Sequence, residues 1–276
     1  MGGGHLSFER DLRPDVMKAI DASPGMAHVN RTHARSFSLN IFRANARELI
    51  AITQQVRDPQ EGLRLWFVDN REEQAQTHRE VKRHVHNFVL AAKTLIDHTR
   101  EFIKEHYANM PVFVSYNSKI KAEFSEAPVA KFVQDLRNYM THRGLPSSDL
   151  FFQARQNPDR PEDGQTLVMG VQYRTEELLQ WDRWTAPARK YIEEADEHLQ
   201  IHVFAEDYVE RVLRFHAWLD AELNAHHAAD LEHLRSLQDE FGRLAAREYS
   251  RVGGREAICV RGCCGGRRHS DVRVPR

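Results

Sequence analysis

The stretch from Asp69 to Tyr107 contains neither proline nor glycine, the two residues that most readily end a helix. Apolar side chains recur along it at the three- and four-residue spacing of one helix face: Val81, Val85, Phe88, Val89, Ala92, Leu95, Ile96, Phe102 and Ile103. The pattern predicts one long amphipathic helix. Because such a helix is stable only when its apolar face is covered, we expect it to pack within a bundle.

Shorter helical patterns flank this segment. One covers "NIFRANARELIAITQQV" and ends at "RDPQEG", and a second covers "VSYNSKIKAEF". A third runs from Val129 to His142, begins after Pro128 and is stopped by "GLP". Helical pattern returns near Thr175 and, after a break near "WTAPA", continues to about Tyr249. Residues 1–39, with "RPD" and "SPG", are expected to be irregular.

The segment near 150–173 differs from the rest. "DLFFQARQ" and "QTLVMGVQYR" favour β-strands, and "NPDRPEDG" between them is typical of a turn that joins antiparallel strands. The predicted fold class is therefore mainly α, a multi-helix bundle with one small antiparallel β-hairpin inserted near 150–173. We expect residues 1–250 to form a single domain, with long C-terminal helices over 175–249.

Residues 251–276 form a tail rich in glycine and arginine, with almost no apolar period, and are predicted to be disordered. The three cysteines of the chain, Cys259, Cys263 and Cys264, all lie in this tail, which excludes a disulfide scaffold for the body. Together with His269 they are possible metal ligands, but their spacing matches no standard zinc site. A basic arm that contacts a polyanion and a tail without function are the alternatives.

The charge balance restricts the classes of function. The 276 residues contain 39 Lys and Arg against 40 Asp and Glu, so a nucleic-acid site would have to be local. No apolar run is long enough for a membrane span, and the first residues lack the apolar core of a secretory signal. We therefore expect a cytoplasmic protein without membrane contact. No nucleotide-binding or zinc-protease motif is present, and no cofactor is expected.

The helix expected over 129–142 carries a polar face opposite its core residues. Asp135, Asn138 and His142 are spaced i, i+3 and i+7 and so share one side, with Arg137 about 100° round from Asn138. Other Arg and His residues of the chain have a similar spacing. Only Arg137 is followed by Asn and placed before a Gly-Leu-Pro that ends a helix.

Arg137, Asn138, three further residues and His142 resemble the R-x4-6-H motif of HEPN domains, over the helices from about 40 to 145. That resemblance implies an all-helical up-down core and a metal-independent endoribonuclease or RNA-binding protein, of a toxin or phage-defence type. Arg137 would stabilise negative charge on the phosphorane, Asn138 would orient the substrate or His142, and His142 would act as general base or acid. RNA and a second copy of the chain, which would complete the site across a homodimer, are the implied partners.

The alternative is a non-catalytic interaction or scaffold protein. In that interpretation Arg137, Asn138 and His142 form a structural polar clamp, supported by Asp135, and His142 gains stability from the helix dipole. A metal site is a further candidate, because Glu194, His198, His202 and Glu206 would lie on one face of a continuous helix. That face is more typical of a solvated surface. Whether the protein is an enzyme is therefore left open by the residues.

Overall fold

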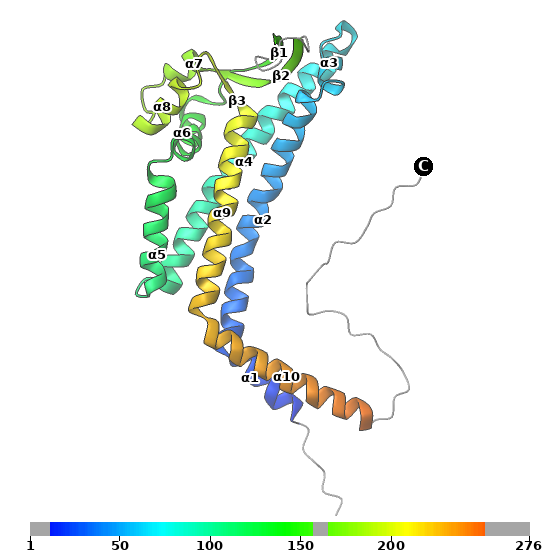
Figure 1. Cartoon of the computed structure of the whole chain (residues 1–276), viewed down its shortest axis with the longest axis vertical. Helices are drawn as coiled ribbons and strands as arrows, with labels where there is room; N and C mark the ends of the chain where they lie inside the picture. Colours follow the sequence, from blue (N-terminus) through cyan, green and yellow to red (C-terminus); the bar gives the residue numbers. More distant parts are fainter. Residues whose placement is uncertain (1–11, 157–164, 252–276) are drawn as a thin grey trace, which may run out of the picture. The chain divides into compact units, whose positions relative to one another are not determined.

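The computed structural model describes residues 12–156 and 165–251, and most of these residues are helical (Figure 1). The predicted mainly α fold is confirmed. The chain divides into two compact units where the sequence predicted one domain. The larger unit runs from Ala27 to Ala229, and the smaller combines the chain up to Met26 with the chain from Asp230 onward.

The elements follow one another as a series of helices with a small sheet between α6 and α9 (Figure 1). In chain order they are α1 (Arg13–Ala22), α2 (Pro24–Arg57), α3 (Glu61–Arg64), η1 (Val68–Asn70), α4 (Arg71–Tyr107), α5 (Pro111–Ile120), η2 (Lys121–Ser125), α6 (Pro128–Arg143), β1 (Ser148–Gln156), β2 (Gln165–Arg174), α7 (Thr175–Leu179), α8 (Ala186–Glu193), β3 (His198–Gln200), α9 (Ile201–His226) and α10 (Ala228–Arg251). No helix in these described ranges is both long enough and apolar enough to cross a bilayer.

Helix α4 confirms the long helix predicted from the proline- and glycine-free stretch. Its predicted apolar face is largely buried, and Val81, Val85, Phe88 and Val89 are fully buried. Acidic residues occupy its first turn and basic residues its last turn, which is the arrangement that the helix dipole favours.

The irregular structure expected for residues 1–39 is wrong from residue 13 onward, where α1 and α2 are helical. Pro14 and Pro24 lie in the first turns of these helices, where a missing N–H costs no hydrogen bond. The hydroxyl of Ser23 accepts a hydrogen bond from the N–H of Met26 at 3.1 Å and so caps α2. Prolines that looked like breaks in the sequence therefore begin helices.

The smaller unit is held by apolar contacts between the ends of the chain. Val16 and Ile20 of α1 pack with Leu234 of α10, and further α10 side chains cover them: Leu237, Phe241 and Leu244. Gly25 permits a close approach within this unit, because a Cβ there would lie 2.4 Å from the carbonyl oxygen of Asp230.

The predicted hairpin is confirmed as β1 and β2, which pair antiparallel from Ser148 opposite Tyr173 to Gln156 opposite Gln165. A third strand, β3, pairs antiparallel with β2 and was not predicted. The break predicted near "WTAPA" is present between α7 and α8. Strand β3 is a second interruption, in the helical pattern expected to continue from there to about Tyr249. That expectation is wrong at β3, because pairing with β2 competes with helix formation there.

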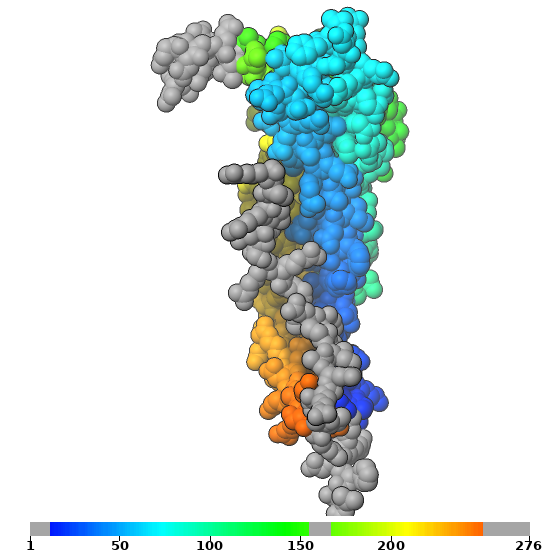
Figure 2. Space-filling model, turned by 90° about the vertical axis from the view of Figure 1, so that its right-hand side faces the viewer, coloured from blue at the N-terminus to red at the C-terminus, as the bar shows by residue number. Residues whose placement is uncertain are grey.

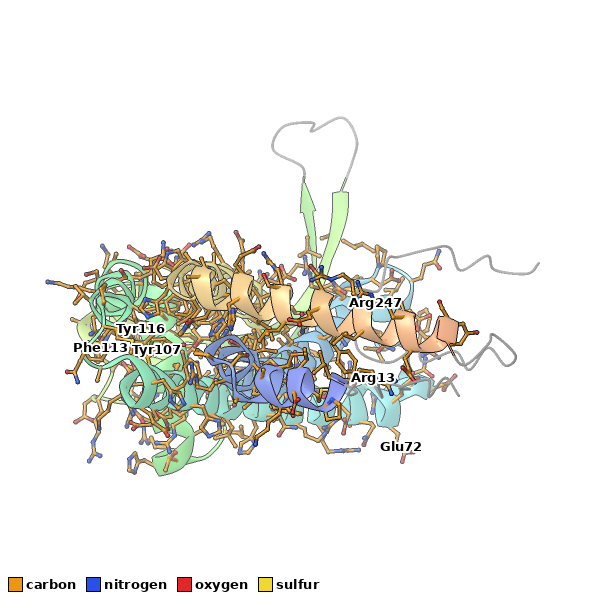
Figure 3. All side chains as sticks on the ribbon, turned by 90° about the horizontal axis from the view of Figure 1, so that it is seen from below. Arg13, Glu72, Tyr107, Phe113, Tyr116 and Arg247 are labelled. Atoms are coloured by element: carbon orange, nitrogen blue, oxygen red, sulfur yellow. The ribbon has the colours of Figure 1, made fainter. Side chains whose placement is uncertain are left out.

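The core of the larger unit lies between α2, α4, α6 and α9. The rings of Phe42, Phe88 and Tyr208 meet there at centroid distances of 5.6 to 6.1 Å. Helix α2 forms an outer face of this unit (Figure 2). A second apolar cluster, which includes Tyr107, Tyr116 and the partly buried Phe113, fills the end of the unit where α4 turns into α5 (Figure 3).

Candidate functional site on helix α6

Helix α6 forms as its sequence predicts. Pro128 begins the helix, and the predicted core residues Val129, Phe132, Val133 and Leu136 are buried. The helix ends at Gly144, whose φ of 89° lies in a region that favours glycine and whose N–H donates to the carbonyl of Met140 at 3.2 Å. The candidate residues therefore lie on a well-bounded helix.

Asp135 is buried and takes part in an internal bond. Its Oδ2 accepts hydrogen bonds from the backbone N–H of Thr185 at 2.8 Å and from the hydroxyl of Thr185 at 2.7 Å. Thr185 is the N-cap residue that precedes α8, at the helix end where backbone N–H groups lack partners within the helix. Asp135 thus attaches the start of α8 to α6, with Phe132 stacked on Trp184 next to it.

Arg137 lies half-buried beside α4 and α9. It lines a small void of about 10 Å³ together with Val89, Val133 and Tyr208, and its Nε is buried without a hydrogen-bond partner among the described residues. Its Nη1 donates a long hydrogen bond of 3.4 Å to Oδ1 of Asn138. Arg137 and Asn138 are thus brought together, but the arginine stem is directed toward the bundle.

His142 stands apart from these residues. Its side chain is exposed in the last turn of α6, and within the described ranges it makes no hydrogen bond or ion pair with Arg137 or Asn138. Five residues of helix rotate His142 by about 140° from Arg137, whereas Asn138 and His142 differ by about 40°. The structure therefore joins Arg137 to Asn138, ties Asp135 to α8 and leaves His142 separate.

The proposed metal face does not form. Glu194 follows the end of α8, His198 lies in β3 and His202 lies in α9, so these residues do not share one helix. Glu206 instead pairs with Arg57 at 3.1 Å. Within residues 12–156 and 165–251, no three His, Cys, Asp or Glu side chains gather in a way that could hold a metal ion. Cys259, Cys263, Cys264 and His269 lie outside the described residues.

A cavity of about 190 Å³ lies close to α6 and was not anticipated. Residues from α4, α5, η2, α6 and α9 line it, and most of them are apolar. One polar lining residue is His216, which is only 3% exposed and whose Nδ1 lies 3.1 Å from Nη1 of Arg35. Burial, and then the positive charges of Arg35 and Arg43, lower the pKa of His216 to about 3.

The sequence held no clear signal for this cavity, because its walls form only where the consecutive elements α4 to α6 pack against the distant α9. His216 is one of 16 histidines in the chain, and its position five residues after Arg211 is a spacing that other Arg and His residues share. Comparison of the chain with protein-family models, with curated proteins and with solved structures gave no match.

Proposed function

We propose that this chain is a non-catalytic helical interaction protein in which polar residues of α6 hold the fold together. The observation that carries this proposal is the pair of hydrogen bonds from Thr185 to Asp135, which uses the buried carboxylate inside the protein. Arg137 is also half-buried, and it lies away from His142. A site that cleaves RNA needs both side chains free to meet the substrate.

The proposed partner is a second copy of the chain, which binds along strand β1. The sheet has the order β1-β2-β3, so β1 is an edge strand. Among the described residues, no strand pairs with its outer side, and the backbone groups there can pair with another chain. Beside it lies an apolar surface, here called the tip patch, with an exposed Trp66 ring 5.9 Å from Phe152. Its members are Trp66, Phe67, Val68, Phe152 and Leu167.

Strand β1 suits pairing with its own copy. An antiparallel pair centred on Phe152 places Leu150 of each copy opposite Ala154 of the other, so apolar residues face each other on one side of the joined sheet. The two tip patches would then lie on one continuous surface. Exposed apolar surfaces of this kind mark interaction sites more often than isolated apolar residues do.

Light scattering after size-exclusion chromatography tests this proposal. The wild type is expected to elute as a dimer and Phe152→Lys as a monomer with the same melting temperature, because the lysine would bring two charges together at the centre of the pair. Val114→Lys is the control, since Val114 is exposed on α5 outside the tip patch. A monomeric wild type, or a dimeric Phe152→Lys, would contradict self-association through β1.

A metal-independent ribonuclease is the second candidate function. It is favoured by Asn138 and His142, which share a side of α6 at its end, and by the contact of Asn138 with Arg137. RNA cleavage in the presence of EDTA distinguishes the two functions. We expect no cleavage by the wild type. Cleavage by the wild type that disappears in His142→Ala, at unchanged melting temperature, would replace the interaction proposal with the enzyme.

A further inference from the structure

The cavity beside α6 has walls that suit an aromatic ring. Phe124 and Phe215 meet edge to face at a centroid distance of 5.3 Å, and Tyr116 lies 6.0 Å from Phe215. Aliphatic side chains and Tyr208 complete the apolar lining: Leu95, Ile96, Ile120, Tyr208 and Val212. A ring held between such side chains gains both burial and edge-to-face contacts.

One wall of the cavity is formed by a π-helical segment. Helix α5 continues into η2 over Lys121–Ser125 with the wider π-helical winding, and Phe124 and Ser125 of this segment line the cavity. Single π-helical turns are rare and are frequently found at functional sites. The winding is therefore a second feature, independent of the cavity itself, that is typical of a binding site.

Three polar groups at the cavity can donate hydrogen bonds. The guanidinium of Arg35 can only donate, so Nδ1 of His216 accepts from it and the neutral ring carries its proton on Nε2. Thr99 is 3% exposed, and its hydroxyl has no hydrogen-bond partner among the described residues. Lys131 is half-buried at the cavity and forms no ion pair in the same ranges.

These groups indicate the chemistry of a ligand that would suit the cavity. With His216 neutral, Lys131 carries the only formal charge among the described lining residues. An ammonium, a free hydroxyl and an imidazole N–H all suit an acceptor that carries negative charge. The volume restricts the apolar part of the ligand, because a cavity of about 150 Å³ already holds benzene.

We propose that this cavity is a binding site for a compact aromatic carboxylate, with its ring among Phe124, Tyr208 and Phe215 and its carboxylate on Lys131. The hydroxyl of Thr99 donates a further hydrogen bond to the carboxylate. The site is independent of self-association through β1. It lies inside the larger unit, so the full chain is the protein to test.

Fluorine NMR with para-fluorobenzoate as the probe tests the site. The wild type is expected to bind it at millimolar concentration or below, and Lys131→Met to bind it at least about tenfold more weakly because the charged hydrogen bond is lost. Lys104→Met removes an exposed lysine from α4 that does not line the cavity, and should bind as the wild type does. Ala92→Leu, which fills the cavity from α4, should abolish binding.

Four results would overturn the proposal. The first three are no binding by the wild type, unchanged binding by a folded Ala92→Leu, and unchanged binding by Lys131→Met. Para-fluorobenzyl alcohol supplies the same ring without the charge, so equal affinity for it would exclude a carboxylate site. Thr99→Val should weaken binding of the acid about fivefold while the protein remains folded, because it removes one hydrogen bond at constant volume.

Discussion

Asp135 and Thr185, 50 positions apart in the chain, are joined by two hydrogen bonds to a single carboxylate oxygen. Helix α6 and the first residue before α8 are fixed to each other by this pair. The bond gives the start of α8 the acceptor that its own sequence does not provide, because Thr185 makes no capping bond with its own side chain.

We expect Asp135→Ala to lower the free energy of unfolding by about 1–3 kcal/mol, because two partly buried hydrogen bonds to this carboxylate are lost. Asp135→Asn should retain most of this stability, since its amide oxygen can still accept. Urea unfolding measures both changes. Asp182→Ala, an exposed acidic residue just before Thr185, is the control and should lie within about 0.5 kcal/mol of the wild type. Equal effects of Asp135→Ala and Asp182→Ala would contradict the clamp.

Arg137 and His142 should differ in their effect on stability. Arg137→Ala is expected to lower the free energy of unfolding by about 1 kcal/mol or more, because the arginine stem packs beside Val89 and Tyr208. His142→Ala should change it by less than about 0.5 kcal/mol, since the side chain is exposed. Thermal and urea unfolding measure both. A large loss with His142→Ala would show that this histidine belongs to the clamp.

Thr99→Val should stabilise the ligand-free protein by about 1 kcal/mol, because it replaces a buried hydroxyl that has no partner by a methyl group of the same shape. Thr53→Val is a matched control. Thr53 is equally buried, but its hydroxyl donates to the carbonyls of Leu49 and Ile50. That substitution should therefore not stabilise the protein. Calorimetric melting temperatures compare the two, and a Thr99→Val melting temperature below that of the wild type would contradict the proposed unpaired state.

Stability should fall on acidification because of His216. Its pKa is lowered to about 3 in the folded protein, so the unfolded chain binds the proton more readily between that value and about 6.5. Unfolding is then favoured as the pH falls through this window, by up to about 1.4 kcal/mol per pH unit. Arg35 and Arg43 oppose protonation of the ring, whereas Asp220, which pairs with Arg35, would favour it.

The His216 contribution can be isolated with His216→Gln, which retains an acceptor for Arg35 but does not titrate. Urea unfolding at several pH values between 4 and 7 should show a weaker pH dependence for the variant than for the wild type. Carboxylates titrate in both proteins, so their contribution cancels in the difference. Parallel curves for the two proteins would mean that His216 is protonated as readily in the folded state as in the unfolded chain.

Several elements of the fold could be predicted from the sequence because their signals are local. The apolar period of α4 and the proline and glycine that bound α6 are contained within each segment, and the hairpin follows from two β-favouring runs around a turn. The prediction failed for α1 and the start of α2, where prolines begin helices, and at β3. That strand is only three residues long and is stabilised by its pairing with β2.

The candidate residues of α6 show the same limit. Helical geometry grouped Asp135 with Asn138 and His142, but it could not show that Asp135 is buried or that Thr185 is its hydrogen-bond partner. It also brought Arg137 and His142 into one hypothetical cluster, which the structure separates. The burial and the hydrogen-bond partners of each side chain depend on which neighbouring helix packs against it.

The sequence by itself determined the helical class, the long α4 and the bounds of α6, because hydrophobic period and backbone restrictions act over a few residues. Only the tertiary structure decided that Asp135 holds α8 and that Thr99, Lys131 and His216 line one cavity. These groups lie on α4, α6 and α9, and their partners are set by helix packing over long distances in the chain. Local patterns carry no information about which polar group will be left buried without a partner.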